Sequence, residues 1–157
     1  MDFGFSPEQN RLRAELRALL RGPVVQDILA ELGRLPPRAP RHSPELYRLL
    51  AERGWLAIHW PVAYGGGGRS EVEAGIFVEE AGRAGVPLLV YGLTVSIFGA
   101  FLLLAGTEAQ KRTLLPPIAR GEMICNILYT EPDAGSDLAA LRTRAGPDGD
   151  EFVITGT

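Results

Sequence analysis

The sequence predicts a mainly α fold, in which a helical domain over residues 1–121 is followed by the beginning of an incomplete β domain over residues 122–157. Three observations lead to this prediction. Apolar residues recur at three- and four-residue spacing before residue 121, which is the period of an amphipathic helix. A capping box, in which Ser or Thr precedes Glu or Gln by three residues, occurs three times. After residue 121 the pattern changes to alternation and ends in a Pro-Asp-Gly-Asp turn.

Composition excludes several classes of protein. The 157 residues are 46% hydrophobic and carry a net charge of −3, so a folded core is expected and disorder is not. The charges are interspersed without a polybasic run, which gives no indication of a nucleic-acid partner. The single cysteine, Cys125, lies in an apolar segment, where we expect a small buried residue and not a nucleophile. The N-terminus lacks the pattern of a signal peptide, and a cytoplasmic protein is expected.

The first helix has a clear start. Ser6 is followed by Pro7 and Gln9, leucines then recur on one face, and the helix is expected to end near Gly22. Its arginines are expected to form a solvated face. Two further helices are expected, separated by a proline-rich loop. The expected ranges are 24–32 for the second helix, 33–41 for the loop and 43–54 for the third helix.

Residues 54–68 are expected to form a loop that contains four consecutive glycines, Gly65–Gly68. Such a run implies either mobility or close backbone contact. No G-K-[ST] and no strand-glycine-helix fingerprint is present, so we reject both nucleotide-binding motifs. Neither His59 nor His42 has a second histidine or a carboxylate pair nearby in sequence, so we expect packed or exposed loop histidines and predict no metal site.

A fourth helix is expected to begin at the capping box of Ser70 and Glu73. Glu79 and Glu80 resemble an acid pair, but neighbours on a helix point about a hundred degrees apart, so both are expected to be surface charges. The expected buried positions of this helix are Val72, Ile76, Phe77 and Ala81.

Residues 88–105 contain no charge, so a membrane span has to be considered. Because Pro87, Gly92 and Gly99 interrupt the run, we favour a central helix buried on all sides. The two glycines would let another helix, or an extended apolar ligand, pack closely against it.

The last third of the chain is expected to change from helix to strand. A helix that begins at Thr107 is expected to reach Leu115, where Pro116 and Pro117 break it. The expected β elements are a strand over 123–128 and a hairpin of 142–145 and 151–154 around a turn at 147–150.

The 129–141 loop, Y-T-E-P-D-A-G-S-D-L-A-A-L, holds the candidate site. Gly135 permits a tight turn or the close approach of a ligand. Thr130 and Ser136 offer hydroxyls, and a turn leaves free backbone N–H groups, which suits a carbonyl-rich ring edge or a phosphate. The alternative is an ordinary strand-turn-strand corner in which Ser136 and Asp137 cap the turn.

This loop resembles the flavin-binding signature of the acyl-CoA dehydrogenase family, and the similarity extends along the chain. The order and spacing of the motifs match throughout, and the W-P-x-x-Y-G-G form is most similar to bacterial, actinobacterial-type members. The other matching motifs are F-S-P-E-Q at 5–9, G-W-L-A-I-H-W-P-V-A-Y-G-G at 54–66, G-T-E-A-Q-K-R-T-L-L-P-P-I-A-R-G-E at 106–122 and L-R-T-R-A-x-x-D-G-D-E-F-V-I-T-G-T at 141–157.

The resemblance implies an N-terminal helical domain, a central β-barrel domain and a C-terminal four-helix domain, with FAD between the last two. In this family a glutamate of the C-terminal domain removes the α-proton of an acyl-CoA while the flavin accepts a β-hydride, which gives a trans-2-enoyl-CoA. That glutamate is absent from this sequence, so no catalytic residue is assigned. The chain is expected to be an inactive fragment of an enzyme of fatty-acid or sterol side-chain β-oxidation.

The resemblance also implies roles for individual residues. Tyr129 and Thr130 would contact the isoalloxazine ring of FAD, partly through backbone groups. Gly135 and Ser136 would hold the pyrophosphate region, and Ser136 would also lie near the thioester arm of the acyl-CoA substrate. Residues 88–105 would form one wall of the acyl pocket.

Partners and alternatives follow from the same resemblance. Electron-transferring flavoprotein would accept the electrons, and full-length members are usually dimers or tetramers.

Tyr129 and Asp133 depart from the commonest form of the signature, and Asp133 adds negative charge near an anionic cofactor. The alternatives are a related acyl-CoA oxidase or flavin monooxygenase, and a non-catalytic split subunit that lends helices to a flavin-bearing partner.

Overall fold

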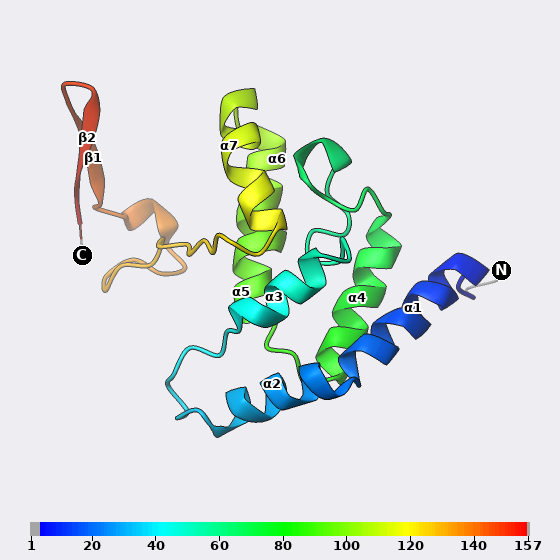
Figure 1. Ribbon diagram of the computed structural model, residues 1–157. Coiled ribbons are helices and arrows are strands. Elements are labelled where there is room, and N and C mark those ends of the chain that lie inside the picture. Colours follow the sequence, from blue (N-terminus) through cyan, green and yellow to red (C-terminus); the bar gives the residue numbers. More distant parts are fainter. Residues whose placement is uncertain (1–3, 157) are drawn as a thin grey trace. The chain divides into compact units, whose positions relative to one another are not determined.

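The computed structural model describes residues 4–156 and confirms a mainly helical chain with a small sheet near its C-terminal end (Figure 1). Residues 1–3, which belong to the segment without a signal-peptide pattern, and residue 157 lie outside the described part. By its contacts the chain divides into two compact units, Met1–Asn126 and Ile127–Thr157. The boundary predicted near residue 121 stays a prediction.

The helices of the first half of the chain begin where the capping pattern predicts. The hydroxyl of Ser6 accepts the backbone N–H of Gln9 at 3.2 Å, and the Gln9 side chain accepts the Ser6 N–H at 2.9 Å, which completes the box. The same reciprocal pair joins Ser70 and Glu73. The elements are α1 (Pro7–Leu20), α2 (Pro23–Arg34), α3 (Pro44–Ala51), a short 3₁₀ helix η1 (Val62–Tyr64) and α4 (Glu71–Arg83).

The expected helix over 88–105 forms, but with two differences from the prediction. Its middle is a π-helix, and its side chains are not buried on all sides, because an apolar row remains exposed. None of the helices between residues 4 and 156 has the length and apolarity needed to cross a membrane. The segments are α5 (Leu89–Tyr91), η2 (Gly92–Gly99) and α6 (Ala100–Ala105), and the exposed row is Leu89, Ile97, Phe101 and Leu104.

Helix α7 (Glu108–Ala119) begins at the Thr107 capping box and continues past the residue where the sequence predicts its end. Pro116 and Pro117 lie in its last turn, so the predicted break at Leu115 is wrong. A proline costs a helix the hydrogen bond to the carbonyl four residues earlier. Because Ile118 and Ala119 are buried in the core, the packing of the last turn offsets that loss.

The core of the helical unit contains the inner faces of the helices and the 54–68 loop. Trp60 is fully buried, and the glycine run packs against it: a Cβ at Gly66 would overlap Trp60, and one at Gly67 would lie 2.7 Å from the carbonyl oxygen of Gly54. Close backbone contact is therefore the reason for Gly66 and Gly67. On α4 the prediction is right for Ile76, Phe77 and Ala81 and wrong for Val72, which is half exposed because it lies in the first turn.

The second unit contains a β-hairpin of β1 (Arg144–Asp148) and β2 (Glu151–Thr155), as the sequence predicts, although β1 begins later than predicted and includes Pro147 and Asp148 of the predicted turn. The strands are antiparallel, and Gly149 at the turn has a φ of +61°, which suits glycine. The strand expected over 123–128 does not form. This segment is extended, but no segment within residues 4–156 forms a ladder with it.

Candidate functional site

The 129–141 loop begins with a tight turn in the second unit. Glu131 and Ala134 exchange two backbone hydrogen bonds, of 2.9 and 3.1 Å, around Pro132 and Asp133. Ala134 is the buried residue of this turn, with 1% of its surface exposed. The turn therefore has a defined conformation that rests on backbone hydrogen bonds.

Glu131 anchors the turn to the start of the hairpin. Its carboxylate accepts the backbone N–H of Arg142 at 2.9 Å and that of Thr143 at 2.7 Å, and it also accepts the Thr143 hydroxyl. The Thr143 hydroxyl bond, helped by the two N–H donors, lowers the pKa of Glu131. Sequence reasoning did not single out Glu131. The sequence feature that could have indicated this role is a carboxylate directly before the Pro132 turn, with the start of the predicted hairpin following in the chain.

The four predicted cofactor-binding residues are Tyr129, Thr130, Gly135 and Ser136, and the structure leaves all of them exposed. None of them makes a hydrogen bond within the described chain. A Cβ at Gly135 would meet open space. Three hydroxyls, those of Tyr129, Thr130 and Ser136, and several backbone N–H groups are thus available on one short loop. This donor set fits the carbonyl edge and the phosphates of a flavin dinucleotide.

A hollow of about 430 Å³ lies beside the same turn. Glu131, Asp133, Arg142 and Thr143 contribute polar groups to its wall, whereas none of the four predicted cofactor residues does. The alternative, in which Ser136 and Asp137 cap the turn, is supported by no side-chain hydrogen bond from either residue within residues 4–156. The backbone carbonyl of Asp137 accepts the N–H of Ala140 instead.

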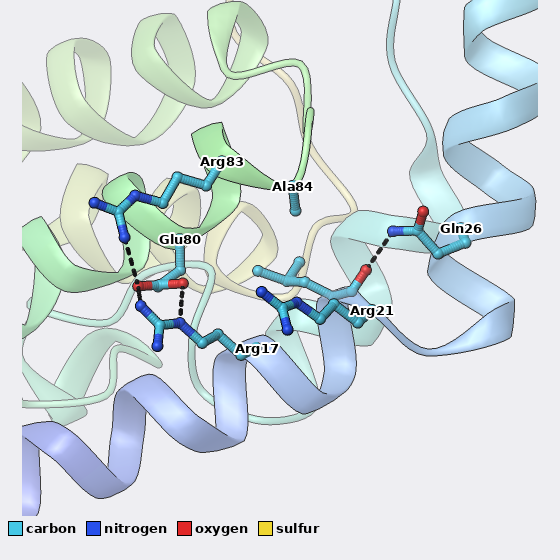
Figure 2. Close-up of a pocket in the computed structure, with 7 residues that line it drawn as sticks. Arg17, Arg21, Gln26, Glu80, Arg83 and Ala84 are labelled. Atoms are coloured by element: carbon cyan, nitrogen blue, oxygen red, sulfur yellow. Dashed lines mark hydrogen bonds and ion pairs between the residues drawn. The ribbon is translucent and has the colours of Figure 1, made fainter.

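Glu80 corrects the prediction that the acid pair on α4 is surface charge. It is 4% exposed, and Arg17 of α1 donates two hydrogen bonds to its carboxylate, of 2.7 and 2.9 Å (Figure 2). Arg13 at 3.4 Å and Arg83 at 3.9 Å complete the ion-pair cluster. The Arg17 hydrogen bond lowers the pKa of Glu80 against the opposing effect of burial. Part of the arginine row on α1 is therefore an inter-helix contact and not a solvated face.

A hollow of about 280 Å³ adjoins this cluster, where α1, α2 and α4 meet (Figure 2). Gln26 closes one side by donating a 2.7 Å hydrogen bond to the carbonyl of Leu20, at the C-terminal end of α1. Since the cationic groups here are largely paired with Glu79 and Glu80, we assign the cluster to packing of the helical unit.

The remaining candidate groups are Cys125, His42 and His59. Burial raises the pKa of the half-buried Cys125 thiol, which disfavours a thiolate nucleophile. Burial lowers the pKa of His42, whose ring packs edge-on against Tyr47 at 4.5 Å. Nδ1 of His59 is buried without a partner among the described residues. Within residues 4–156 no group of three or more His, Cys, Asp or Glu side chains could hold a metal ion.

The family model for the acyl-CoA dehydrogenase N-terminal domain matches residues 6–122. The chain belongs to the acyl-CoA dehydrogenase family. Curated relatives support this membership beyond the matched domain: acyl-CoA dehydrogenase FadE26 of Mycobacterium tuberculosis is 39% identical over 99% of this chain, and FadE29 of the same organism is 40% identical over the same share.

Solved acyl-CoA dehydrogenase structures resemble the chain over nearly its whole length. The Tcur3481-Tcur3483 steroid acyl-CoA dehydrogenase is 43% identical over 99% of this chain, with a TM-score of 0.82. The ChsE4-ChsE5 complex of M. tuberculosis is 38% identical over 99%, with a TM-score of 0.77. The chain spans about two fifths of the length of these relatives, 39% of FadE26 and 40% of the Tcur3481-Tcur3483 chain.

Proposed function

We propose that this chain supplies the acyl-binding helices and the first flavin-binding loop of an FAD-dependent acyl-CoA dehydrogenase that forms trans-2-enoyl-CoA. The observation that carries the proposal is the 129–141 loop, which presents four exposed residues without internal partners on a turn that Glu131 holds in shape. A related acyl-CoA dehydrogenase from Bacillus anthracis, 30% identical over 97% of this chain, is described as complexed with FAD.

In this proposal the chain's own residues bind and orient. Thr130 and the backbone near Tyr129 donate hydrogen bonds toward the ring, where negative charge develops on reduction. Gly135 leaves room for the backbone to approach the pyrophosphate, and Ser136 adds a hydroxyl donor there and near the substrate thioester. FAD, when bound, supplies the acceptor for the hydride. The catalytic carboxylate and the remaining walls of the site come from the part of the fold that these 157 residues do not contain.

The proposed substrate is an acyl-CoA with a bulky polycyclic tail. A solved relative that is 43% identical is described as a steroid acyl-CoA dehydrogenase, which favours a steroid over a straight fatty chain. The exposed row of Leu89, Ile97, Phe101 and Leu104 offers an apolar surface that suits such a tail. Electron-transferring flavoprotein is the proposed acceptor, and the cytoplasm the proposed compartment.

The flavin-binding part of the proposal is tested in the complete protein, meaning this chain together with the segment or partner that supplies the rest of the fold. Ser136→Ala and Thr130→Val should each weaken FAD binding about tenfold, because each removes a hydrogen bond to a charged or charge-developing group. Thr113→Val, an exposed change on α7, is the matched control. Unchanged FAD affinity in both loop variants would show that Thr130 and Ser136 do not belong to the cofactor site.

A second candidate function is a non-catalytic subunit that lends helices to a flavin-bearing partner. It is favoured by the two-component ChsE4-ChsE5 complex, one of the solved structures that the chain resembles. Co-purification with a flavin-bearing homologue identifies this case. An oxidase would instead be recognised by hydrogen peroxide that forms in step with turnover in air.

A further inference from the structure

Thr94 and Cys125 are joined by two hydrogen bonds that use one hydroxyl group. The Thr94 Oγ1 donates to the Cys125 carbonyl at 3.1 Å and accepts the Cys125 backbone N–H at 3.1 Å. The two residues are 31 positions apart, and both belong to the helical unit. Thr94 is 1% exposed, so this hydroxyl is a buried polar group whose partners are both backbone atoms.

This pair of bonds satisfies the backbone N–H and C=O of Cys125. The segment 123–128 is extended and apolar, yet it forms no ladder within the described chain. Buried backbone N–H and C=O groups require partners, and in an antiparallel sheet a neighbouring residue exchanges both bonds with its opposite number. The Thr94 hydroxyl makes the same two bonds to Cys125 by acting as donor and acceptor together.

The position of Thr94 in its helix is also unusual. Threonine in a helix commonly bonds a carbonyl of its own preceding turn, whereas this hydroxyl bonds to another segment. Thr94 lies in the π-helix η2, a wide and rare helical form that is often found at functional sites. Val95 and Gly99 of the same π-helix are buried, so this face of η2 is fixed in the core.

We propose that Thr94 is a positioning residue, which fixes the extended end of the helical unit from which the chain continues into the 129–141 loop. Cys125 precedes Tyr129 by four positions, and the bonds at Thr94 are the last side-chain hydrogen bonds of the helical unit before that loop. The expected effect of Thr94 on FAD affinity rests on the proposed function. The expected effect of Thr94 on the Cys125 backbone amide is independent of the proposed function.

The first test measures amide hydrogen exchange at Cys125 in the 157-residue chain. Thr94→Val keeps the shape of the side chain and removes the hydroxyl, so exchange at the Cys125 amide should become at least about tenfold faster. Thr94→Ser retains the hydroxyl and should restore slow exchange, and Thr113→Val is the control for an exposed threonine. Equal Cys125 exchange in wild type and Thr94→Val overturns the proposal.

The second test measures FAD affinity in the complete protein. Thr94→Val should weaken FAD binding by about tenfold, and Thr94→Ser should restore it. A variant elsewhere in the helical unit with the same thermal stability as Thr94→Val should bind FAD as wild type does. Faster exchange with unchanged FAD affinity in Thr94→Val overturns the positioning role and leaves a packing contact. If the wild-type protein binds no FAD, the proposed function fails, and the exchange measurement alone still decides whether Thr94 holds Cys125.

Discussion

Glu80 illustrates how a single carboxylate can connect two helices. It is buried on α4 between arginines of α1 and of its own helix. Glu80→Gln leaves these guanidinium groups without their shared carboxylate and should lower the free energy of unfolding by about 2–3 kcal/mol, less than for a fully buried pair because Arg17 is partly exposed. Glu79→Gln, at a half-exposed position, should cost less than about 1 kcal/mol. Denaturant melts in which the two variants lose the same stability would contradict this account.

The lowered pKa of His42 should make the free energy of unfolding depend on pH. Burial lowers its pKa below the ordinary value of 6.5, so the folded state favours the neutral imidazole. As the pH falls below about 6.5, the unfolded chain binds a proton that the folded chain resists, and the free energy of unfolding decreases until the folded pKa is passed. Glu31, Glu45 and Arg48 line a hollow beside His42, but burial and not these charges is the cause of the lowered pKa.

His42→Phe should remove that component of the pH dependence and keep an aromatic contact with Tyr47. The measurement is the free energy of unfolding at about pH 7 and about pH 5.5 for both proteins. We expect wild type to lose more stability than the variant between these two values. Parallel curves would show that His42 does not contribute.

Replacing Glu131 should change amide exchange only near the 129–141 loop. Glu131→Ala removes the acceptor of the Arg142 and Thr143 amides, so both amides should exchange faster while exchange in α1 and α4 stays unchanged. Asp133→Ala is a suitable control, because Asp133 belongs to the same turn and makes no hydrogen bond within the described chain. Unaltered protection at Thr143 in Glu131→Ala would show that the turn holds without this anchor.

At the scale of elements, the π-helix η2 packs against the 54–68 loop through one glycine. A Cβ at Gly99 would overlap the buried ring of Trp60, whereas a Cβ at Gly92 would meet open space. Gly99→Ala should therefore lower the free energy of unfolding by about 1–3 kcal/mol through overpacking. Gly92→Ala should be neutral or stabilising by up to about 1 kcal/mol, because alanine favours helix. Thermal melts of the two variants distinguish these results, and equal melting temperatures would contradict the close contact.

The elements that sequence predicts well are those with local signals. Capping boxes at Ser6, Ser70 and Thr107 give the helix starts, and the Asp-Gly turn gives the hairpin. The burial of Glu80 depends on helices more than sixty residues apart, and the Thr94 bond depends on a π-helix, so neither has a local signal. In the loop, the roles of the Thr130 and Ser136 hydroxyls and of Gly135 stay predictions, whereas the Glu131 anchor was missed because its partners lie eleven and twelve residues away.

At the scale of the whole molecule, these residues supply the helical unit and the start of a β unit of an acyl-CoA dehydrogenase fold. The apolar row of Leu89, Ile97, Phe101 and Leu104 and the unpartnered loop donors are the surfaces on which the proposed function depends. The chain alone should bind FAD weakly or not at all. A stoichiometric flavin spectrum after gel filtration of the 157-residue chain would contradict that expectation.

The most direct measurement of the proposed function is anaerobic mixing of the complete flavoprotein with acyl-CoA substrates. A steroid acyl-CoA should bleach the visible absorbance of the oxidised flavin and yield one enoyl-CoA per flavin reduced, and a straight-chain acyl-CoA should do so more slowly. An unchanged flavin spectrum with both classes of acyl-CoA would contradict the proposed acyl-CoA dehydrogenase activity.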